Sequence, residues 1–267
     1  MPRSIWTGAI SFGLVNIPIK LATAVRSHDI RFNLIEPEEK ARVRQQYVVE
    51  SDGKEVDRGD LAKGYEIAPD TYVILEPEEL QSIRPEATKT MELSDFVELR
   101  EIDPVFFERP YYLLPGQGAA KAYRLLAQAL EDAGKVGIAT FVMRSREYLA
   151  AIRAVNGVLV LETMRFDDEV VAPADLEGIP GDEVDVTEKE LSIAKQVIES
   201  LTTTFDPQAY KDTYRDAVMD LIEKKAEGEE IVISGPQPEE AVKVINLMDA
   251  LEKSLEMAKK RKKKKSA

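Results

Sequence analysis

Three apolar segments in the middle of the chain, separated by very short connections, constrain its fold more than any other feature. The segments span residues 136–143, 147–155 and 158–164. Asn156-Gly157, which joins the last two, is the strongest short signal for a β-hairpin, because a turn of this kind needs positive φ at both positions. The first connection, Arg144-Ser145-Arg146, is equally short and forms a basic loop tip. The pattern predicts an antiparallel three-stranded meander.

The amino-terminal stretch SIWTGAISFGLVNIPIKLATA is apolar, but it lacks the pattern of a secretion signal or a membrane span. Polar residues interrupt it, and Lys20 stands just before the small residues where a signal would be cleaved. A membrane helix needs about 20 apolar residues without charge. Apolar residues alternate over 10–14 and, with opposite parity, over 17–21, which predicts two strands joined by a bend near Gly13. Pro18 predicts that the second is an edge or bulged strand.

Shorter patterns predict further strands and one helix in the first two thirds of the chain. The strand candidates lie at 42–49, 65–67, 71–75, 95–99 and 111–114. The helix is predicted over 119–133, and Gly134 is suited to end it. Its apolar stripe consists of Tyr123, Leu126, Ala127 and Leu130. The expected fold class is mainly β with α.

After residue 167 the sequence becomes acidic and its patterns become helical. The capping box Thr187-x-x-Glu190 predicts a helix to about residue 201. Asp206-Pro207 predicts a second helix, which would end near Gly228. A third helix is predicted over 238–257, and a disordered polycation is expected from Lys259 onward.

Composition excludes several kinds of chemistry. The 267-residue chain has no cysteine, which excludes disulfides, thiolate zinc sites and cysteine nucleophiles and suits a reducing, cytosolic setting. The chain has one histidine, His28, so a metal site with histidine ligands or a catalytic triad could use only that residue. The sequence contains no phosphate-binding loop, dinucleotide-binding motif, nucleophile elbow or zinc-protease motif. We expect no enzymatic activity and no cofactor or metal.

Charge is segregated along the chain. The net charge of −13 argues at first against nucleic acid as a partner. Residues 1–48 and 116–165, however, each carry 7 Lys and Arg against 4 Asp and Glu, whereas residues 166–257 carry 8 against 24. The last ten residues carry 7 basic groups and no acid. Acidic helices with solvent-exposed faces would explain the segregation of charge. The same distribution is also typical of a protein with a basic internal surface, an acidic exterior and a basic tail.

Nucleic-acid binding without base reading requires only Lys and Arg placed to contact phosphates. Arg144 and Arg146 flank a predicted hairpin tip, and Arg42 and Arg44 would share one face of their predicted strand. The candidates in the basic segments are Arg26, Arg31, Arg42, Arg44, Lys121, Arg124, Arg144, Arg146 and Arg153. Those in the tail are Lys259, Lys260, Arg261, Lys262 and Lys263. Each residue taken alone also has the simpler interpretation of a solvated surface charge.

Several stretches together point to one family. SIWTGAISFGLVNIPIKL and HDIRFNLI begin the chain, and KGYEI, DPVFFERPYYLLPG, LSIAKQVIESLTTTFDPQAYKDTYRDAVMDLIEKK and VINLMDALEKSL follow. These stretches resemble the bacterial Ku family, the DNA-end-binding proteins of non-homologous end joining. The resemblance extends from about Arg3 to Lys260. One departure is that Val49 and Asp52 stand where many relatives carry a C-x-x-C pair, so a zinc or redox role of that pair is absent here.

The resemblance implies an architecture and a function. It implies a Ku-type β-barrel with a bridge insertion over 1–185, a helical arm over 186–235, and an amphipathic helix with a basic tail over 236–267. It also implies a non-catalytic homodimeric ring that threads double-stranded DNA ends regardless of sequence, protects them, and recruits the ATP-dependent DNA ligase of end joining. The expected location is cytoplasmic and nucleoid-associated, away from membranes.

The predicted helix over 238–257 has an apolar stripe that the core does not need, as a helix that docks on the ligase would have. The stripe residues assigned to partner binding are Val244, Ile245, Met248, Leu251 and Leu255. Packing of this helix on its own core or on a second subunit would explain the same stripe.

Two other functions are compatible with the sequence. One is a protein adaptor with the same barrel that contacts DNA mainly through its basic tail. The more remote one is a metal-dependent nuclease that uses acid pairs such as Asp167-Asp168.

Overall fold

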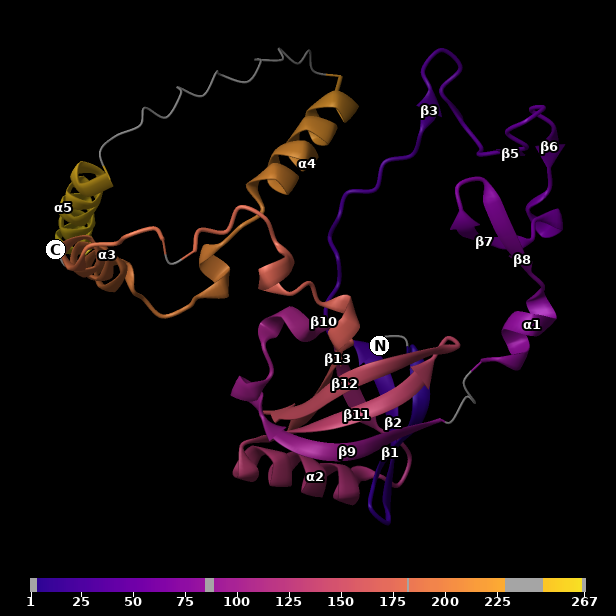
Figure 1. Cartoon of the computed structure of the whole chain (residues 1–267), viewed down its shortest axis with the longest axis horizontal. Helices are drawn as coiled ribbons and strands as arrows, with labels where there is room; N and C mark the ends of the chain where they lie inside the picture. The colour runs from indigo at the N-terminus through magenta and orange to yellow at the C-terminus, as the bar shows by residue number, and fades with distance from the viewer. Residues whose placement is uncertain (1–3, 85–88, 182, 229–246, 266–267) are drawn as a thin grey trace. The chain divides into compact units, whose positions relative to one another are not determined.

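The computed structural model describes residues 4–84, 89–181, 183–228 and 247–265 (Figure 1). The chain divides into two compact units, Met1–Asp175 and Leu176–Ala267. A closed β-barrel forms the core of the first unit, and the regular structure of the second is helical. The expectation of a mainly β chain with α-helices is confirmed.

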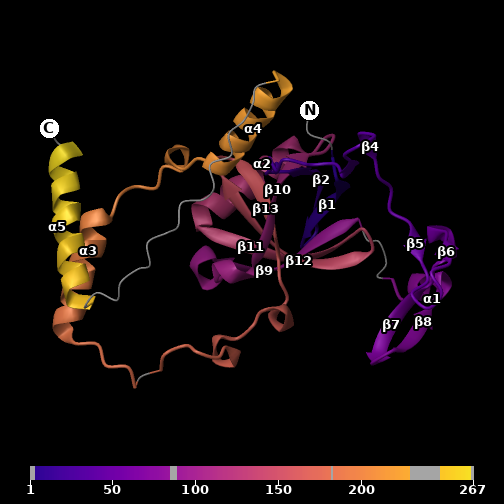
Figure 2. The ribbon, with the colours of Figure 1, turned by 90° about the horizontal axis from the view of Figure 1, so that it is seen from above.

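Seven strands form the closed barrel (Figures 1 and 2). In barrel order they are β1 (Trp6–Phe12), β2 (Val15–Thr23), β10 (Phe107–Pro115), β13 (Val158–Met164), β12 (Arg146–Val155), β11 (Lys135–Met143) and β9 (Thr90–Glu98). Neighbouring strands are antiparallel except β1 and β9, whose parallel pairing closes the barrel. The meander β11–β12–β13 is confirmed, with Asn156 and Gly157 at φ 52° and 76° in its second turn.

The hairpin of β1 and β2 explains the change of parity in the amino-terminal stretch. Phe12 pairs with Val15 across a two-residue turn in which Gly13 has φ 58°. The same register places Ile10 opposite Ile17, so both side chains point into the barrel and are buried. The predicted bend at Gly13 is therefore the tip of a tight hairpin.

β2 is an internal strand, and its prediction as an edge or bulged strand is wrong. It pairs with β1 on one side and with β10 on the other. Pro18 is tolerated because the β10 ladder ends at Ile19, so no ladder bond needs its missing N–H. The Pro18 carbonyl still accepts a hydrogen bond of 2.8 Å from the Gly116 N–H.

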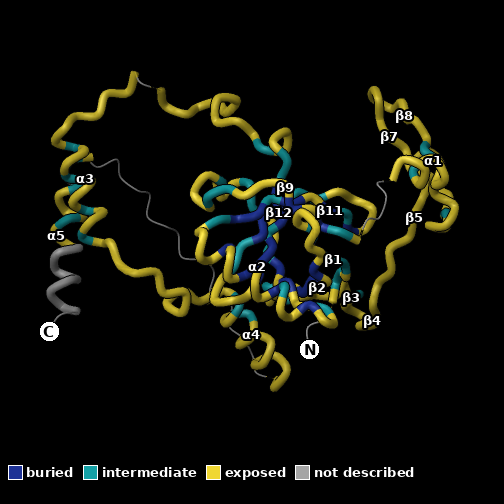
Figure 3. The backbone as a smooth tube through the Cα atoms, turned by 90° about the horizontal axis from the view of Figure 1, so that it is seen from below, coloured by how far each residue is buried: buried dark blue, intermediate teal, exposed yellow. Residues whose placement is uncertain are grey.

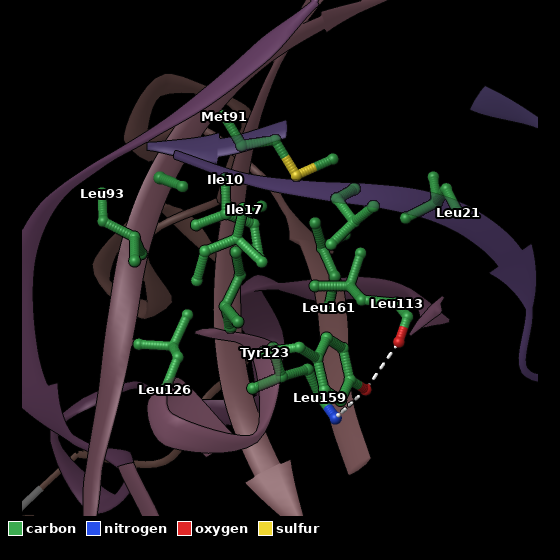
Figure 4. Packing of buried hydrophobic residues seen from close by; sticks show 14 of the residues in the cluster. Ile10, Ile17, Leu21, Met91, Leu93, Leu113, Tyr123, Leu126, Leu159 and Leu161 are labelled. Carbon is green, nitrogen blue, oxygen red and sulfur yellow. Dashed lines mark hydrogen bonds between the residues drawn. The ribbon is translucent and has the colours of Figure 1, made fainter. Parts of the chain in front are cut away.

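Helix α2 (Ala120–Ala133) packs on the end of the barrel to which the β1–β2 hairpin also belongs (Figures 1 and 4). Its buried residues are those of the predicted stripe, Tyr123, Leu126, Ala127 and Leu130, and they join the barrel interior in one core cluster. Gly134 ends the helix at φ 62°, as predicted. One end of the barrel is thus sealed by apolar side chains.

The hydroxyl of Tyr123 joins two strands at the point where they separate. The β10–β13 ladder ends at Tyr112 and Val160. Just beyond it, the Tyr123 hydroxyl donates to the Leu113 carbonyl at 2.7 Å and accepts from the Leu159 N–H at 2.8 Å (Figure 4). Burial raises the pKa of Tyr123, so this hydroxyl stays protonated and able to donate.

Replacing Tyr123 with Phe should destabilise the barrel without enlarging any side chain. Removal of the hydroxyl leaves a buried carbonyl and a buried N–H without their partner, which costs about 1–3 kcal/mol. We expect a lower midpoint in thermal unfolding followed by circular dichroism. Tyr112→Phe on the exposed face of β10 is the matched control and should leave the midpoint unchanged; equal midpoints for both variants would show that the Tyr123 bonds contribute nothing.

Residues 24–89 lie between β2 and β9 and are called the insertion below; they contain three two-stranded sheets that are not part of the barrel sheet. Their elements are β3 (Ile35–Glu36), β4 (Ala41–Arg42), β5 (Tyr47–Val48), β6 (Glu55–Val56), η1 (Arg58–Asp60), β7 (Lys63–Ala68), β8 (Thr71–Leu75) and α1 (Pro77–Ser82). The single strand predicted over 42–49 is wrong, because its two ends pair with different partners, β3 and β6. Arg42 and Arg44 therefore do not lie on one strand.

Short 3₁₀ helices complete the first unit. They are η2 (Leu99–Glu101), η3 (Pro104–Phe106), η4 (Asp167–Glu169) and η5 (Pro173–Asp175). The η2–η3 segment places Ile102 and Phe106 against Val136 and Met164, so a second, smaller apolar cluster covers part of the outer face of the meander. The cluster also contains Phe107 at the start of β10.

The helices of the second unit begin at side-chain caps. The predicted capping box opens α3 (Glu188–Leu201): the Thr187 hydroxyl donates to the Glu190 carboxylate at 2.6 Å and lowers the pKa of that group. Asp206 and Pro207 open only the single turn η6 (Pro207–Ala209), so the predicted start of the second helix is wrong. α4 (Thr213–Ala226) begins later because Asp212 provides its own cap.

Helix α5 (Leu247–Lys265) packs against α3 within the second unit. It continues through the basic tail to Lys265, so the prediction of a disordered polycation from Lys259 is wrong for this part of the backbone, in line with the high helix propensity of Lys and Arg. Figure 3 shows burial concentrated in the barrel, whereas most of the second unit is exposed. Within the described ranges, no helix has the length and apolar character needed to cross a membrane.

Candidate nucleic-acid interface

The barrel end opposite α2 is hollowed and lined by arginines. The hollow has a volume of about 620 Å³. Thr23, Val25 and Ser27 contribute from the end of β2 and from the segment that leaves the barrel after it. Arg109 and Glu108 contribute from β10, Arg144 from the β11–β12 turn and Arg146 from the start of β12. Three guanidinium groups from two separate parts of the sequence therefore line one hollow.

The β11–β12 turn has an unusual backbone conformation. Met143 pairs with Arg146, and the two turn residues Arg144 and Ser145 have φ of 54° and 63°. Two-residue hairpins of this kind need positive φ at both central positions, where Gly and Asn are the usual residues. Arg144 therefore places its charge at the tip of a two-residue hairpin.

A chain of ion pairs links two residues of the hollow, Arg146 and Glu108, through Glu169 and Arg165. Arg146 Nη2 lies 3.2 Å from Glu169 Oε1, and the Arg146 guanidinium lies over the Tyr148 ring, 5.7 Å from its centroid. Arg165 contacts the same Glu169 oxygen at 3.8 Å and Glu108 at 3.5 Å. Arg109 and Arg144 form no ion pair with any residue that the structure describes. Glu108 and Arg146, which also line the hollow, are thus paired with Arg165 and Glu169, whereas Arg109 and Arg144 keep their positive charges without an ion pair.

The other predicted residues of the barrel lie elsewhere. Arg153 is half-buried on β12, where its Nε and Nη2 donate to Glu162 Oε1 at 3.0 and 2.7 Å. Lys121 and Arg124 are exposed on α2, at the sealed end of the barrel. Arg146 and Arg144 are therefore the predicted barrel residues that the structure brings together at the hollow, with Arg26 exposed on the segment that leaves it.

Arg109 of the hollow and Arg165 of the neighbouring ion pairs were missed by the sequence analysis. Arg109 lies in the segment 49–115, which carries 7 Lys and Arg against 17 Asp and Glu, so counting charge by segment concealed it. Arg165 ends the meander and was counted but not selected. The signal available for Arg109 was the motif FERPYY, in which one arginine stands among three aromatic residues. The pairing of β10 with β13 and of β13 with β12 brings it to the hollow that Arg144 and Arg146 also line.

The remaining predicted residues lie in the insertion and the second unit. Arg31, Arg42 and Arg44 are exposed in the insertion. For the tail residues Lys259, Lys260, Arg261, Lys262 and Lys263, the structure describes only the helical backbone. Val244 and Ile245 lie outside the described residues, whereas Met248, Leu251 and Leu255 are half-buried on α5, the helix that packs against α3.

The segment that carries Val49 and Asp52 is closed by main-chain hydrogen bonds. The Val49 N–H donates to the Lys54 carbonyl at 2.9 Å, and the Gly53 N–H donates to the Val49 carbonyl at 2.8 Å. The Asp52 carboxylate accepts from the Lys54 N–H at 3.0 Å. No cluster of three or more potential metal ligands occurs among the residues that the structure covers.

Comparison with known proteins assigns the barrel. The family model described as the Ku70/Ku80 beta-barrel domain matches residues 11–193. The non-homologous end joining protein Ku of Anaeromyxobacter sp. (strain K) is 46% identical over 98% of this chain and 88% of its own length. The proteins of that name from Bacillus subtilis (strain 168) and Archaeoglobus fulgidus are 38% and 39% identical, over 95% and 96% of this chain and 82% and 100% of their own lengths.

Proposed function

The chain belongs to the Ku family, and on that basis we propose that it binds double-stranded DNA ends without reading their sequence, as a non-catalytic protein of non-homologous end-joining repair. The observation that carries the proposal is the arginine-lined hollow at the open end of the barrel. Guanidinium groups contact phosphate oxygens in any sequence. The site contains no base-reading helix, so affinity would come from the sugar–phosphate backbone.

The hollow lies where the insertion leaves the barrel. Thr23, Val25 and Ser27 line it, and the insertion that follows contains three small sheets with exposed basic residues. In our proposal the insertion forms the bridge of a ring and the arginine-lined barrel end forms its base. Duplex DNA would enter from an end and be held between them.

Exposed aromatic residues support a homodimeric ring. Phe205, Tyr210 and Tyr214 in the second unit are 72–76% exposed, and the Phe205 and Tyr210 rings stack with centroids 5.9 Å apart. Large apolar side chains that are exposed together are typical of interaction surfaces. We propose that they become buried against a second copy of this chain.

The proposed ring would protect DNA ends and recruit the ATP-dependent DNA ligase of end joining, in the cytoplasm and on the nucleoid. For ligase recruitment we retain the apolar residues that the sequence assigned to partner binding: Val244, Ile245, Met248, Leu251 and Leu255. α5 also exposes Leu247 and Met257, which lie outside the half-buried stripe and extend the apolar surface available to a partner.

Deletion of residues 259–267 distinguishes the proposed function from that of an adaptor that contacts DNA through its tail. We expect the truncated chain to bind linear duplex at moderate salt with a modest loss of affinity, because the hollow remains intact. Fluorescence anisotropy with a blunt 30-base-pair duplex measures this. Complete loss of binding by a truncated chain that is still folded would favour the adaptor.

A further inference from the structure

We propose that the arginine-lined hollow binds a single phosphate group of the DNA backbone, and that Glu169 competes with this phosphate for Arg146 and Arg165. This inference rests on the proposed function and adds a residue that sets its affinity. In the free protein, Glu169 would neutralise part of the positive charge of Arg146 and Arg165. When a phosphate enters, it would replace Glu169 as the partner of these arginines.

The hollow has the charges and the access that a phosphate needs. Arg109 and Arg144 line it without an ion-pair partner among the described residues, and both are exposed. Glu108 also lines it, but its carboxylate is paired with Arg165 at 3.5 Å. Arg146 lines it too, with its side chain 62% exposed despite the ion pair. A phosphate in the hollow could accept charge-assisted hydrogen bonds from these guanidinium groups, which are well suited to phosphate.

Glu169 is held where it can imitate a phosphate oxygen. Its Oε2 accepts a 3.0 Å hydrogen bond from the Phe166 N–H, which fixes the carboxylate at the single turn η4. Its Oε1 is shared by Arg146 at 3.2 Å and Arg165 at 3.8 Å. One carboxylate oxygen therefore lies between two guanidinium groups, as an oxygen of a bound phosphate would.

The Glu169 carboxylate and a bound phosphate would compete for the same guanidinium group of Arg146. A carboxylate beside the site repels an incoming phosphate and occupies donors that the phosphate would use. Arg146 has a second support in the Tyr148 ring, so its guanidinium should stay near the hollow when Glu169 loses its charge. The repulsion between Glu169 and the phosphate should therefore lower the affinity, and loss of the Glu169 charge should not displace Arg146.

The test is the substitution Glu169→Gln. Glutamine is of similar size and keeps one oxygen for the Phe166 N–H, while its NH₂ group cannot pair with guanidinium. We expect the dissociation constant for linear duplex to fall about two- to fivefold, the range of a partly exposed ion pair. The salt dependence should become steeper by about one phosphate contact, because a released arginine then neutralises a phosphate fully.

Glu92→Gln is the matched control. Glu92 is an exposed barrel residue on β9 with the same charge change and no ion pair among the described residues. If both variants gain affinity equally, a general charge effect explains the gain and the inference is wrong. Weaker binding by Glu169→Gln would make Glu169 only a positioning residue and would also overturn it.

Two further readouts keep the inference separate from the proposed function and from misfolding. If the unmodified protein binds no linear duplex, the proposed function itself fails. If it binds but Glu169→Gln changes nothing, the inference alone fails. Glu169→Asp, which keeps the charge but withdraws it by one methylene, should give a smaller gain than Gln, and circular dichroism verifies that each variant is folded.

Discussion

Reversing the charge of Arg109, Arg144 and Arg146 together should nearly abolish binding of linear duplex DNA. These residues line one hollow, and the substitution to Glu replaces three attractive contacts with repulsive ones. Hydrogen bonds to charged groups contribute about 1.5–3 kcal/mol each, so we expect the dissociation constant to rise about 100-fold or more. Each lost phosphate contact should also flatten the dependence of log K on log salt by about 0.9.

The control for this triple variant uses three basic residues away from the hollow. Lys20 on β2 and Lys121 and Arg124 on α2 are exposed and form no ion pair with any residue that the structure describes, and their reversal changes the net charge by the same amount. We expect a smaller loss of affinity, since only long-range attraction is reduced. An equal loss in both variants would mean that overall charge, and not the hollow, determines binding.

Introducing charge at Phe205 and Tyr210 should convert the protein to monomers. The two stacked side chains are exposed in the single chain, and a symmetric dimer would bury two copies of each. Aromatic residues at the centre of an interface typically contribute about 2 kcal/mol or more each. We expect Phe205→Glu/Tyr210→Glu to sediment as a monomer at micromolar concentration and to bind linear duplex much more weakly, because a ring cannot close.

Leu14→Glu/Val171→Glu is the corresponding control, since it adds the same charge at exposed apolar positions of the first unit. It should sediment like the unmodified protein. A dimer that survives the Phe205 and Tyr210 substitutions would remove these residues from the proposed interface.

Local signals predicted much of the barrel. Asn156-Gly157 identified the hairpin of β12 and β13, and the stripe that begins at Tyr123 identified α2, because turn chemistry and helical periodicity depend on neighbouring residues. The capping box at Thr187 located α3 for the same reason. These elements would be recognisable in any sequence with such signals.

Features that depend on distant partners were predicted less well. Pro18 indicated an edge strand, but its tolerance depends on where the β10 ladder stops. The segment 42–49 has the pattern of one strand, but its ends pair with two different neighbours. Arg109 becomes part of the hollow only when β10 pairs with β13 and β13 with β12, and no local pattern contains that information.

The central claim is that the protein encircles DNA and is loaded from an end, and topology of the DNA tests it most directly. Binding to a linear duplex should be compared with binding to the same sequence as a covalently closed circle, across a series of salt concentrations. We predict tight, salt-dependent binding to the linear form and only weak binding to the circle, because a DNA circle has no end over which a closed protein ring could pass. Equal affinity for the two forms at every salt concentration would contradict the account.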